Sequence, residues 1–110
     1  MAPIGDVDER VNVLRFDREG AESIALVHFA DHPDVVGGTK ISADWPGFVR
    51  RMTEQDIPDV HCILVNGAQG DVNHVDVTKP PVAVKGDPLL KQKKYDNSRR
   101  MGRIPWPFYP

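Results

Sequence analysis

Three groups of polar residues in this sequence carry side chains that could bind a metal ion or assist hydrolysis. The first is at residues 31–33 (DHP), the second at residues 42–44 (SAD) and the third at residues 67–74 (GAQGDVNH). They supply imidazole, carboxylate and amide groups and a glycine-rich bend, which are usual components of a divalent-metal site. We refer to them as the first, second and third polar clusters.

Several of these residues also have an ordinary structural interpretation. A zinc site needs about three protein ligands, and neither His-Glu-x-x-His nor paired Cys-x-x-Cys spacing occurs in the sequence. His32 fits a capping or turn residue as well as a metal ligand, and Asp44 fits the N-cap of a helix. Gly67 and Gly70 fit turn glycines with positive φ.

Three apolar runs predict the β-strands that would position the clusters. Residues 11–16 (VNVLRF) are rich in β-branched and aromatic types, and the turn sequence DREG follows them. Together with residues 24–30 (IALVHFA) they predict an antiparallel pair. Residues 24–30 and 60–65 (VHCILV) are almost continuously apolar, which predicts strands covered on both faces.

A helix is predicted between the second and third strands, from about residue 45 to residue 55. Pro46 is permitted in its first turn, apolar residues follow at helical spacing, and Pro58 keeps it from running into the next strand. A strand-helix-strand unit of this length usually joins parallel strands through a right-handed crossover. The predicted fold class is therefore α/β, a small mixed sheet of about three to four strands with a crossover helix.

The polar clusters fall where strands end or the helix begins, and open α/β sheets usually bind ligands at the carboxyl ends of their strands. The C-terminal part has weaker signals. Residues 75–90 contain three prolines without a sustained period and predict a loop. Residues 95–103 predict a short helical turn, which the prolines of the final IPWPFYP prevent from continuing.

Composition narrows the functional classes. A length of 110 residues predicts one modest domain. The net charge of −2 gives little support for a nucleic-acid partner. No stretch approaches the roughly 18 to 20 apolar residues of a membrane-spanning helix, and the first residues lack a signal-peptide core, so we expect a cytoplasmic location by default. Cys62 is the single cysteine, and its apolar surroundings predict a small buried hydrophobe.

Two stretches resemble the neutral/alkaline, non-lysosomal ceramidase family. They are residues 25–48 (ALVHFADHPDVVGGTKISADWPGF) and residues 63–78 (ILVNGAQGDVNHVDVT). The order of strand, His-Pro, glycine-containing loop, Asp before a helix, strand and Gly-x-x-Gly-Asp-Val carries the resemblance. It implies that residues 1–103 are a partial catalytic domain, a fragment of a larger α/β zinc-hydrolase domain, and that residues 104–110 are a non-matching tail.

The resemblance implies hydrolysis of the amide bond of ceramide or a related lipid amide at a zinc ion held by two histidines, a glutamate and a tyrosine. His32 matches one of these histidines, and Asp44 matches the aspartate ahead of the helix. Asp71 and Asn73 lie in the segment that bears the family's active-site serine, with Asn73 at the serine's place. Asp44, Asp71 and Asn73 are thus the candidate catalytic residues, and Gly67 and Gly70 the candidate cofactor-binding residues.

The remaining zinc ligands are expected outside this sequence, the second histidine before Met1 and the glutamate and tyrosine after Pro110. We therefore expect a truncated or frame-shifted product, or a fragment, of a longer hydrolase that is inactive in isolation. Uncovered sheet edges in such a piece would favour homo-oligomers.

Two other functions remain open at this point. One is a small non-catalytic binding protein that reuses the scaffold and offers the aromatic residues Trp106, Phe108 and Tyr109 as a contact surface. The other is a metal-dependent phosphoesterase that uses His32, Asp44, Asp71 and His74.

Overall fold

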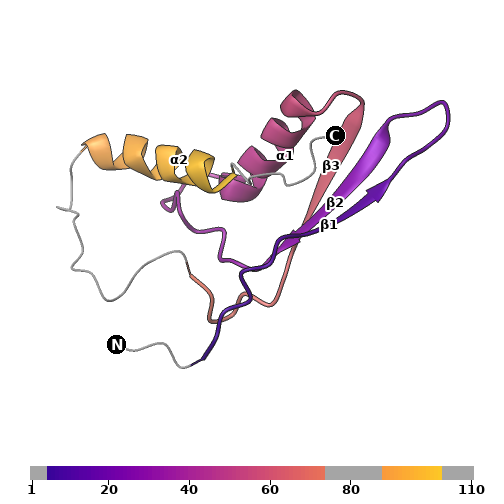
Figure 1. Ribbon diagram of the computed structural model, residues 1–110. Coiled ribbons are helices and arrows are strands. Elements are labelled where there is room, and N and C mark those ends of the chain that lie inside the picture. Colours follow the sequence, from indigo (N-terminus) through magenta and orange to yellow (C-terminus); the bar gives the residue numbers. More distant parts are fainter. Residues whose placement is uncertain (1–4, 74–87, 103–110) are drawn as a thin grey trace.

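A computed structural model describes residues 5–73 and 88–102 of the chain (Figure 1). The elements in order are β1 (Asn12–Phe16), β2 (Ser23–Phe29), α1 (Asp44–Asp56), β3 (Val60–Asn66) and α2 (Pro88–Gly102). The strands form one sheet in the order β1-β2-β3, in which β1 and β2 are antiparallel and β2 and β3 are parallel. The predicted α/β class, the mixed sheet and the helix between parallel strands are confirmed.

The connection between β1 and β2 is held by the side chain of Asp17. Its carboxylate accepts hydrogen bonds from Ser23 Oγ and Arg15 Nε, both at 2.7 Å. These bonds, the one from Ser23 above all, lower the pKa of Asp17. Gly20 takes a φ of +68°, which glycine adopts without steric cost. The turn therefore sets the register in which Phe16 lies opposite Ile24.

The hydrophobic core lies between the sheet and α1. It consists of Val27, Val35, Trp45, Val49 and Cys62, all of them buried. The rings of Trp45 and Phe29 meet edge to face, at a centroid distance of 5.8 Å and an interplanar angle of 82°, a favourable aromatic geometry. Trp45 and Val49 are four residues apart, so one face of α1 buries both against the strands.

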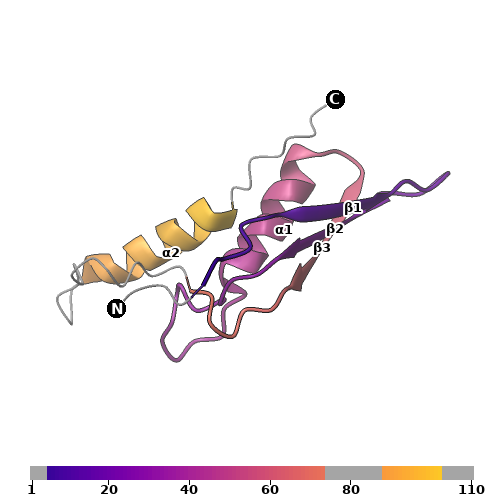
Figure 2. The same ribbon diagram turned by 60° about the horizontal axis from the view of Figure 1, so that its bottom comes forward.

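The opposite face of the sheet is open, contrary to the expectation of strands covered on both faces. The strand register places Leu14 of β1, Leu26 of β2 and Ile63 of β3 side by side on this face. Leu14 and Ile63 remain 54% and 49% exposed. Neither α1 nor the described part of α2 lies over it (Figure 2). In this protein the continuously apolar strands therefore form an apolar surface that the described residues leave uncovered.

α2 is longer than the sequence predicts. Residues 88–90 were expected in a loop but form its first turn, because proline is tolerated at the start of a helix and the leucines and lysines that follow favour helix. α2 packs against α1, closely enough that a Cβ atom on Gly102 would lie 2.4 Å from Phe48 Cβ and 2.9 Å from Val49 N. The expected loop at residues 74–87 and the tail at residues 103–110 lie outside the described residues.

Neither described helix combines the length and apolarity needed to cross a membrane.

The close contact at Gly102 yields the first prediction. Gly102→Ala should destabilise the fold by about 1 to 3 kcal/mol, because the added methyl group meets the backbone of α1 and overpacks the helix contact. Gly→Ala within a helix ordinarily stabilises, so the sign of the effect is diagnostic. Urea unfolding followed by circular dichroism measures it.

Gly70→Ala is the matched control, since no atom lies within 4 Å of its added Cβ. Equal or higher stability of Gly102→Ala would contradict the packing of α2 on α1.

Candidate functional site

The first and third polar clusters meet at the carboxyl ends of β2 and β3. The backbone N–H of His32 donates to the carbonyl of Val72 at 3.1 Å. The side-chain amide of Asn73 donates to Asp34 Oδ2 at 3.3 Å. Because parallel strands end at the same edge of a sheet, the topology places these two loops side by side, as the sequence predicts.

Asn66, the last residue of β3, ties the two strand ends together through its side chain. Its Nδ2 donates to the carbonyl of Asp31 at 3.0 Å and also to Gln69 Oε1, while its Oδ1 accepts the N–H of Asp31 at 3.4 Å. The amide thus continues the pairing of β2 with β3 beyond the last backbone bond, from Gly67 N–H to the carbonyl of Phe29 at 2.9 Å. Sequence reasoning missed this residue, although an Asn directly before a glycine-rich bend is a signal for such a clamp.

Asp44 is a buried junction between three segments. Its Oδ2 accepts the N–H of Val36 at 2.7 Å, and its Oδ1 accepts the N–H of Trp45 at 2.6 Å and the hydroxyl of Ser98 at 3.2 Å. The carboxylate is 5% exposed, so these bonds replace its hydration. Both oxygens are therefore engaged by the fold.

The expected role of Asp44 as the N-cap is corrected by the helix start. α1 begins at Asp44 itself, and Ala43 precedes it without a side-chain cap bond. Asp44 has a φ of +49°, a left-handed conformation that Asp tolerates better than most residues. Its N–H donates to Ser42 Oγ at 3.1 Å. The negative charge still lies in the first turn, where the helix dipole favours it.

His32 is held by its backbone at both ends. Its N–H bonds to Val72, and its carbonyl accepts the indole N–H of Trp45 at 3.1 Å. The second cluster thus joins the other two through Trp45, the neighbour of Asp44. The imidazole of His32 is half-buried at the end of β2. The residue is anchored through its backbone and keeps part of its surface exposed.

The two glycines of the third cluster do not take the positive φ that was expected of them. Gly67 instead allows a close approach, because a Cβ there would lie 2.7 Å from His28 Nε2 and 3.0 Å from Ala30 Cβ. His28 Nδ1 pairs with the side-chain amide of Asn12 at 3.2 Å, and since an amide nitrogen donates, Nδ1 accepts. Gly70 lies in a turn with open space around it.

The described residues do not fit a complete zinc site. Within residues 5–73 and 88–102, no three His, Cys, Asp or Glu side chains are grouped closely enough to hold a metal ion. The oxygens of Asp44 are bonded within the fold, and Asp71 is exposed in a turn. His74, a candidate for a phosphoesterase site, lies outside the described residues. Among the described residues, His32 therefore belongs to no group that could hold a metal ion by itself.

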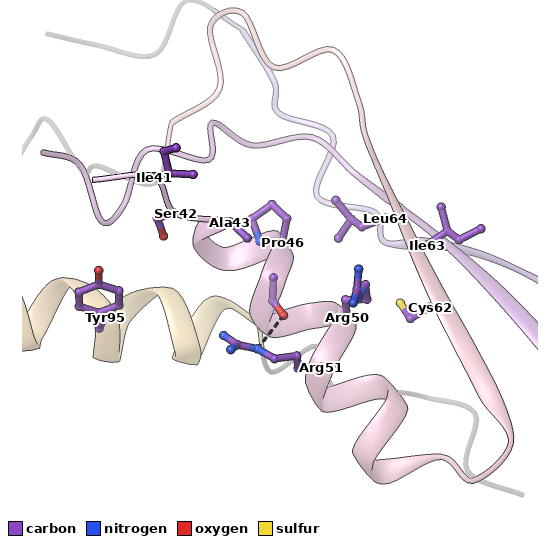
Figure 3. Close-up of a pocket in the computed structure, with 11 residues that line it drawn as sticks. Ile41, Ser42, Ala43, Pro46, Arg50, Arg51, Cys62, Ile63, Leu64 and Tyr95 are labelled. Carbon is purple, nitrogen blue, oxygen red and sulfur yellow. Dashed lines mark hydrogen bonds between the residues drawn. The ribbon is translucent and has the colours of Figure 1, made fainter. Parts of the chain in front are cut away.

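A groove lies between the start of α1, the outer edge of β3 and Tyr95 of α2 (Figure 3). Its volume is about 700 Å³. It is lined by Ile41, Ser42, Ala43, Pro46, Gly47, Arg50, Arg51, Cys62, Ile63, Leu64 and Tyr95. None of the candidate site residues borders it. No pattern in the sequence indicates this groove, because it depends on how α2 packs against α1.

Cys62 is buried at the inner end of this groove, as the sequence predicts. Burial raises the pKa of the thiol, against the lowering effect of a hydrogen bond with Thr53. A raised pKa keeps the thiol protonated at neutral pH, so it is a poor nucleophile.

Comparisons of the chain with models of protein families, with curated proteins and with solved structures found no match. Function is therefore inferred from the residues of this chain and from their placement.

The bonds of Asp44 yield the second prediction. Asp44→Ala should lower the free energy of unfolding by about 2 to 4 kcal/mol, because it leaves buried donors without an acceptor. Asp44→Asn should cost less, since Asn keeps one carbonyl acceptor and tolerates a left-handed backbone. Urea denaturation of the variants measures both losses.

Ser98→Ala removes the hydroxyl that bonds to Asp44 and should cost about 1 kcal/mol. If the urea midpoint of unfolding is the same for Asp44→Ala and for the parent chain, the carboxylate of Asp44 does not stabilise the contact between these segments.

Proposed function

We propose that this chain is a segment of a ceramidase-type zinc amidohydrolase whose parent cleaves the amide bond of ceramide or a related lipid amide. The proposal is supported by one observation above all. The segments that resemble the family meet at the carboxyl ends of β2 and β3 through the bonds of His32 with Val72 and Trp45 and of Asn66 with Asp31. Residues far apart in the sequence thus meet in the region where an α/β hydrolase binds its substrate.

In this proposal His32 supplies one zinc ligand, and the other ligands come from outside the described residues. A bound zinc ion would polarise the amide carbonyl and acidify a water molecule. The chain's own contribution is to hold the backbone of His32 at the strand end and leave part of the residue exposed. A single imidazole binds zinc weakly, so the chain in isolation is inactive.

The other candidate residues take different parts. Asp44 acts as a positioning residue, because its carboxylate links Val36 and Ser98 to the start of α1. Asp71 and Asn73 lie exposed beside the loop of His32. The amide of Asn73 can donate a hydrogen bond to a substrate carbonyl, but it cannot act as a nucleophile or proton relay as a serine hydroxyl does.

The third prediction concerns zinc. The purified chain should retain no stoichiometric zinc, and added zinc should shift the NMR signals of the His32 ring only at millimolar concentration, because one ligand does not make a site. In His32→Ala the amide shifts that zinc causes in residues 31 and 32 should disappear, while any at His61, which lies beside Glu22 and Glu54, persist. Stoichiometric zinc, or shifts in residues 31 and 32 that His32→Ala leaves unchanged, would contradict the proposal.

The proposal that this chain is part of a longer ceramidase-type enzyme is tested by sequencing its gene. Sequencing across the coding region and translating its flanks in all frames should show the family pattern on both sides, with a second histidine upstream and the glutamate and tyrosine downstream. If no reading frame of either flank shows this pattern, the ceramidase assignment is wrong.

The open face of the sheet favours a second candidate function, a non-catalytic binding protein. Its exposed apolar side chains include Leu14, Phe16, Ile63 and Val65, which are 54%, 49%, 49% and 43% exposed. Contiguous apolar surface of this kind marks an interaction site. We propose that two copies of the chain associate through this face and the adjoining outer edge of β1.

Charge on the open face should weaken this association, which is the fourth prediction. Ile63→Lys should shift the chain from dimer towards monomer in sedimentation velocity, because two such faces would bury unpaired ammonium groups. Val7→Lys is the control, since Val7 is as exposed as Leu14, at 54%, but lies outside the three strands. A monomeric parent chain, or equal effects of the two substitutions, would refute the dimer.

A further inference from the structure

The outer edge of β3 is open to pairing with another strand. The N–H of Ser23 donates to the carbonyl of Asp59 at 2.8 Å, and the N–H of Gly67 donates to Phe29 at 2.9 Å. Alternate residues of a strand direct their backbone groups to opposite sides, so Cys62 and Leu64 direct theirs outward, away from β2. No strand among the described residues pairs with this edge.

The carboxylate of Glu54 occupies the position that a backbone carbonyl of an added strand would take. The N–H of Cys62 donates to Glu54 Oε1 at 3.1 Å. The same oxygen lies 3.8 Å from Arg50 Nε and 3.7 Å from His61 Nδ1. Glu54 therefore holds an acceptor where the carbonyl of an added strand would sit. His61 gives its carboxylate an alternative partner when a strand displaces it.

The groove beside this edge is lined by apolar side chains and by two arginines (Figure 3). Its volume of about 700 Å³ is in the range of ligand sites. Ile41, Pro46 and Leu64 supply apolar wall, and Arg50 and Arg51 supply two cations. The described residues that line the groove include no Asp or Glu. Glu54 beside Arg50 offsets one of the two guanidinium charges, so an extended segment in the groove would meet apolar contacts and a net positive charge.

The positive charge of the groove also determines which kind of chain it favours as a partner. Pairing of β3 with β3 of a second copy across a two-fold axis would bring Arg50 and Arg51 towards their own counterparts. Like charges placed together cost free energy, whereas carboxylates from a partner would form charge-assisted hydrogen bonds with the same guanidinium groups. The groove therefore favours a different chain that carries acidic residues.

We propose that the outer edge of β3 binds an extended, acidic peptide segment of a partner protein by strand addition. The backbone of the segment pairs with Cys62 and Leu64, and its acidic side chains bind Arg50 and Arg51. Backbone pairing supplies affinity, and the arginines supply specificity. This site is separate from the strand ends of the proposed hydrolase and requires no metal.

Two fluorescein-labelled peptides of about ten residues, a typical upper length for a strand, provide the test. One alternates Val and Glu, and the other alternates Val and Lys. Fluorescence anisotropy with the full chain should show binding of the acidic peptide and weakening at high salt. The double variant Arg50→Glu, Arg51→Glu should bind the acidic peptide at least about tenfold more weakly, the loss of roughly two exposed charge contacts.

N-methylation of alternate residues of the acidic peptide is the test of strand pairing. Methylation of the amides that face β3 should abolish binding, because it removes their hydrogen bonds to the strand. Methylation of the intervening amides, which face away from β3, should preserve binding. Simple electrostatic attraction would not distinguish the two methylated peptides. Arg15→Glu, a charge reversal outside the groove, should leave binding unchanged. Circular dichroism verifies that each variant is folded.

The proposal is overturned if the acidic peptide fails to bind or the two peptides bind equally. It is also overturned if binding survives both N-methylated registers, or if the double variant binds like the parent. Stronger self-association of the double variant would show that a second copy takes this edge, and would overturn it as well.

Discussion

The buried carboxylate of Asp44 is the interaction on which the arrangement of this molecule depends. It joins the loop after β2, the first turn of α1 and the side of α2 through bonds to Val36, Trp45 and Ser98. Removing a carboxylate from water is costly unless hydrogen bonds replace its hydration. The need to supply those bonds therefore determines where the loop, α1 and α2 can lie.

The need to satisfy buried carboxylate and amide groups distinguishes polar residues that stabilise the fold from those that are available to a ligand. Asp44 has the residue type of a catalytic group, yet its oxygens serve the fold, and its influence reaches His32 through the indole of neighbouring Trp45. Asn66 performs a similar task at the strand ends. Polar side chains with internal partners are thus positioning residues, whereas His32 is only partly buried and Arg50 and Arg51 are exposed.

Local signals predicted the three strands and α1, because apolar runs and Pro58 mark them without reference to the rest of the chain. They could not distinguish a strand covered on both faces from one with an open apolar face, since Ile63 has the same sequence signature in either case. The start of α2 was missed because Pro88 permits a helix as readily as a loop. The convergence of the polar clusters followed from topology, but the groove and the contact at Gly67 depend on packing between distant segments.

The bond between Asp44 and Ser98 spans 54 residues of sequence, which has a consequence for the order of folding. On the ribosome, α1 and β3 are complete well before Ser98 is synthesised, so the carboxylate must remain hydrated in the nascent chain. The hairpin of β1 and β2 is made of local contacts and can form early, since nearby contacts close at low entropic cost. Docking of α2 then follows, and it completes the withdrawal of Asp44 from water only after Ser98 has been synthesised.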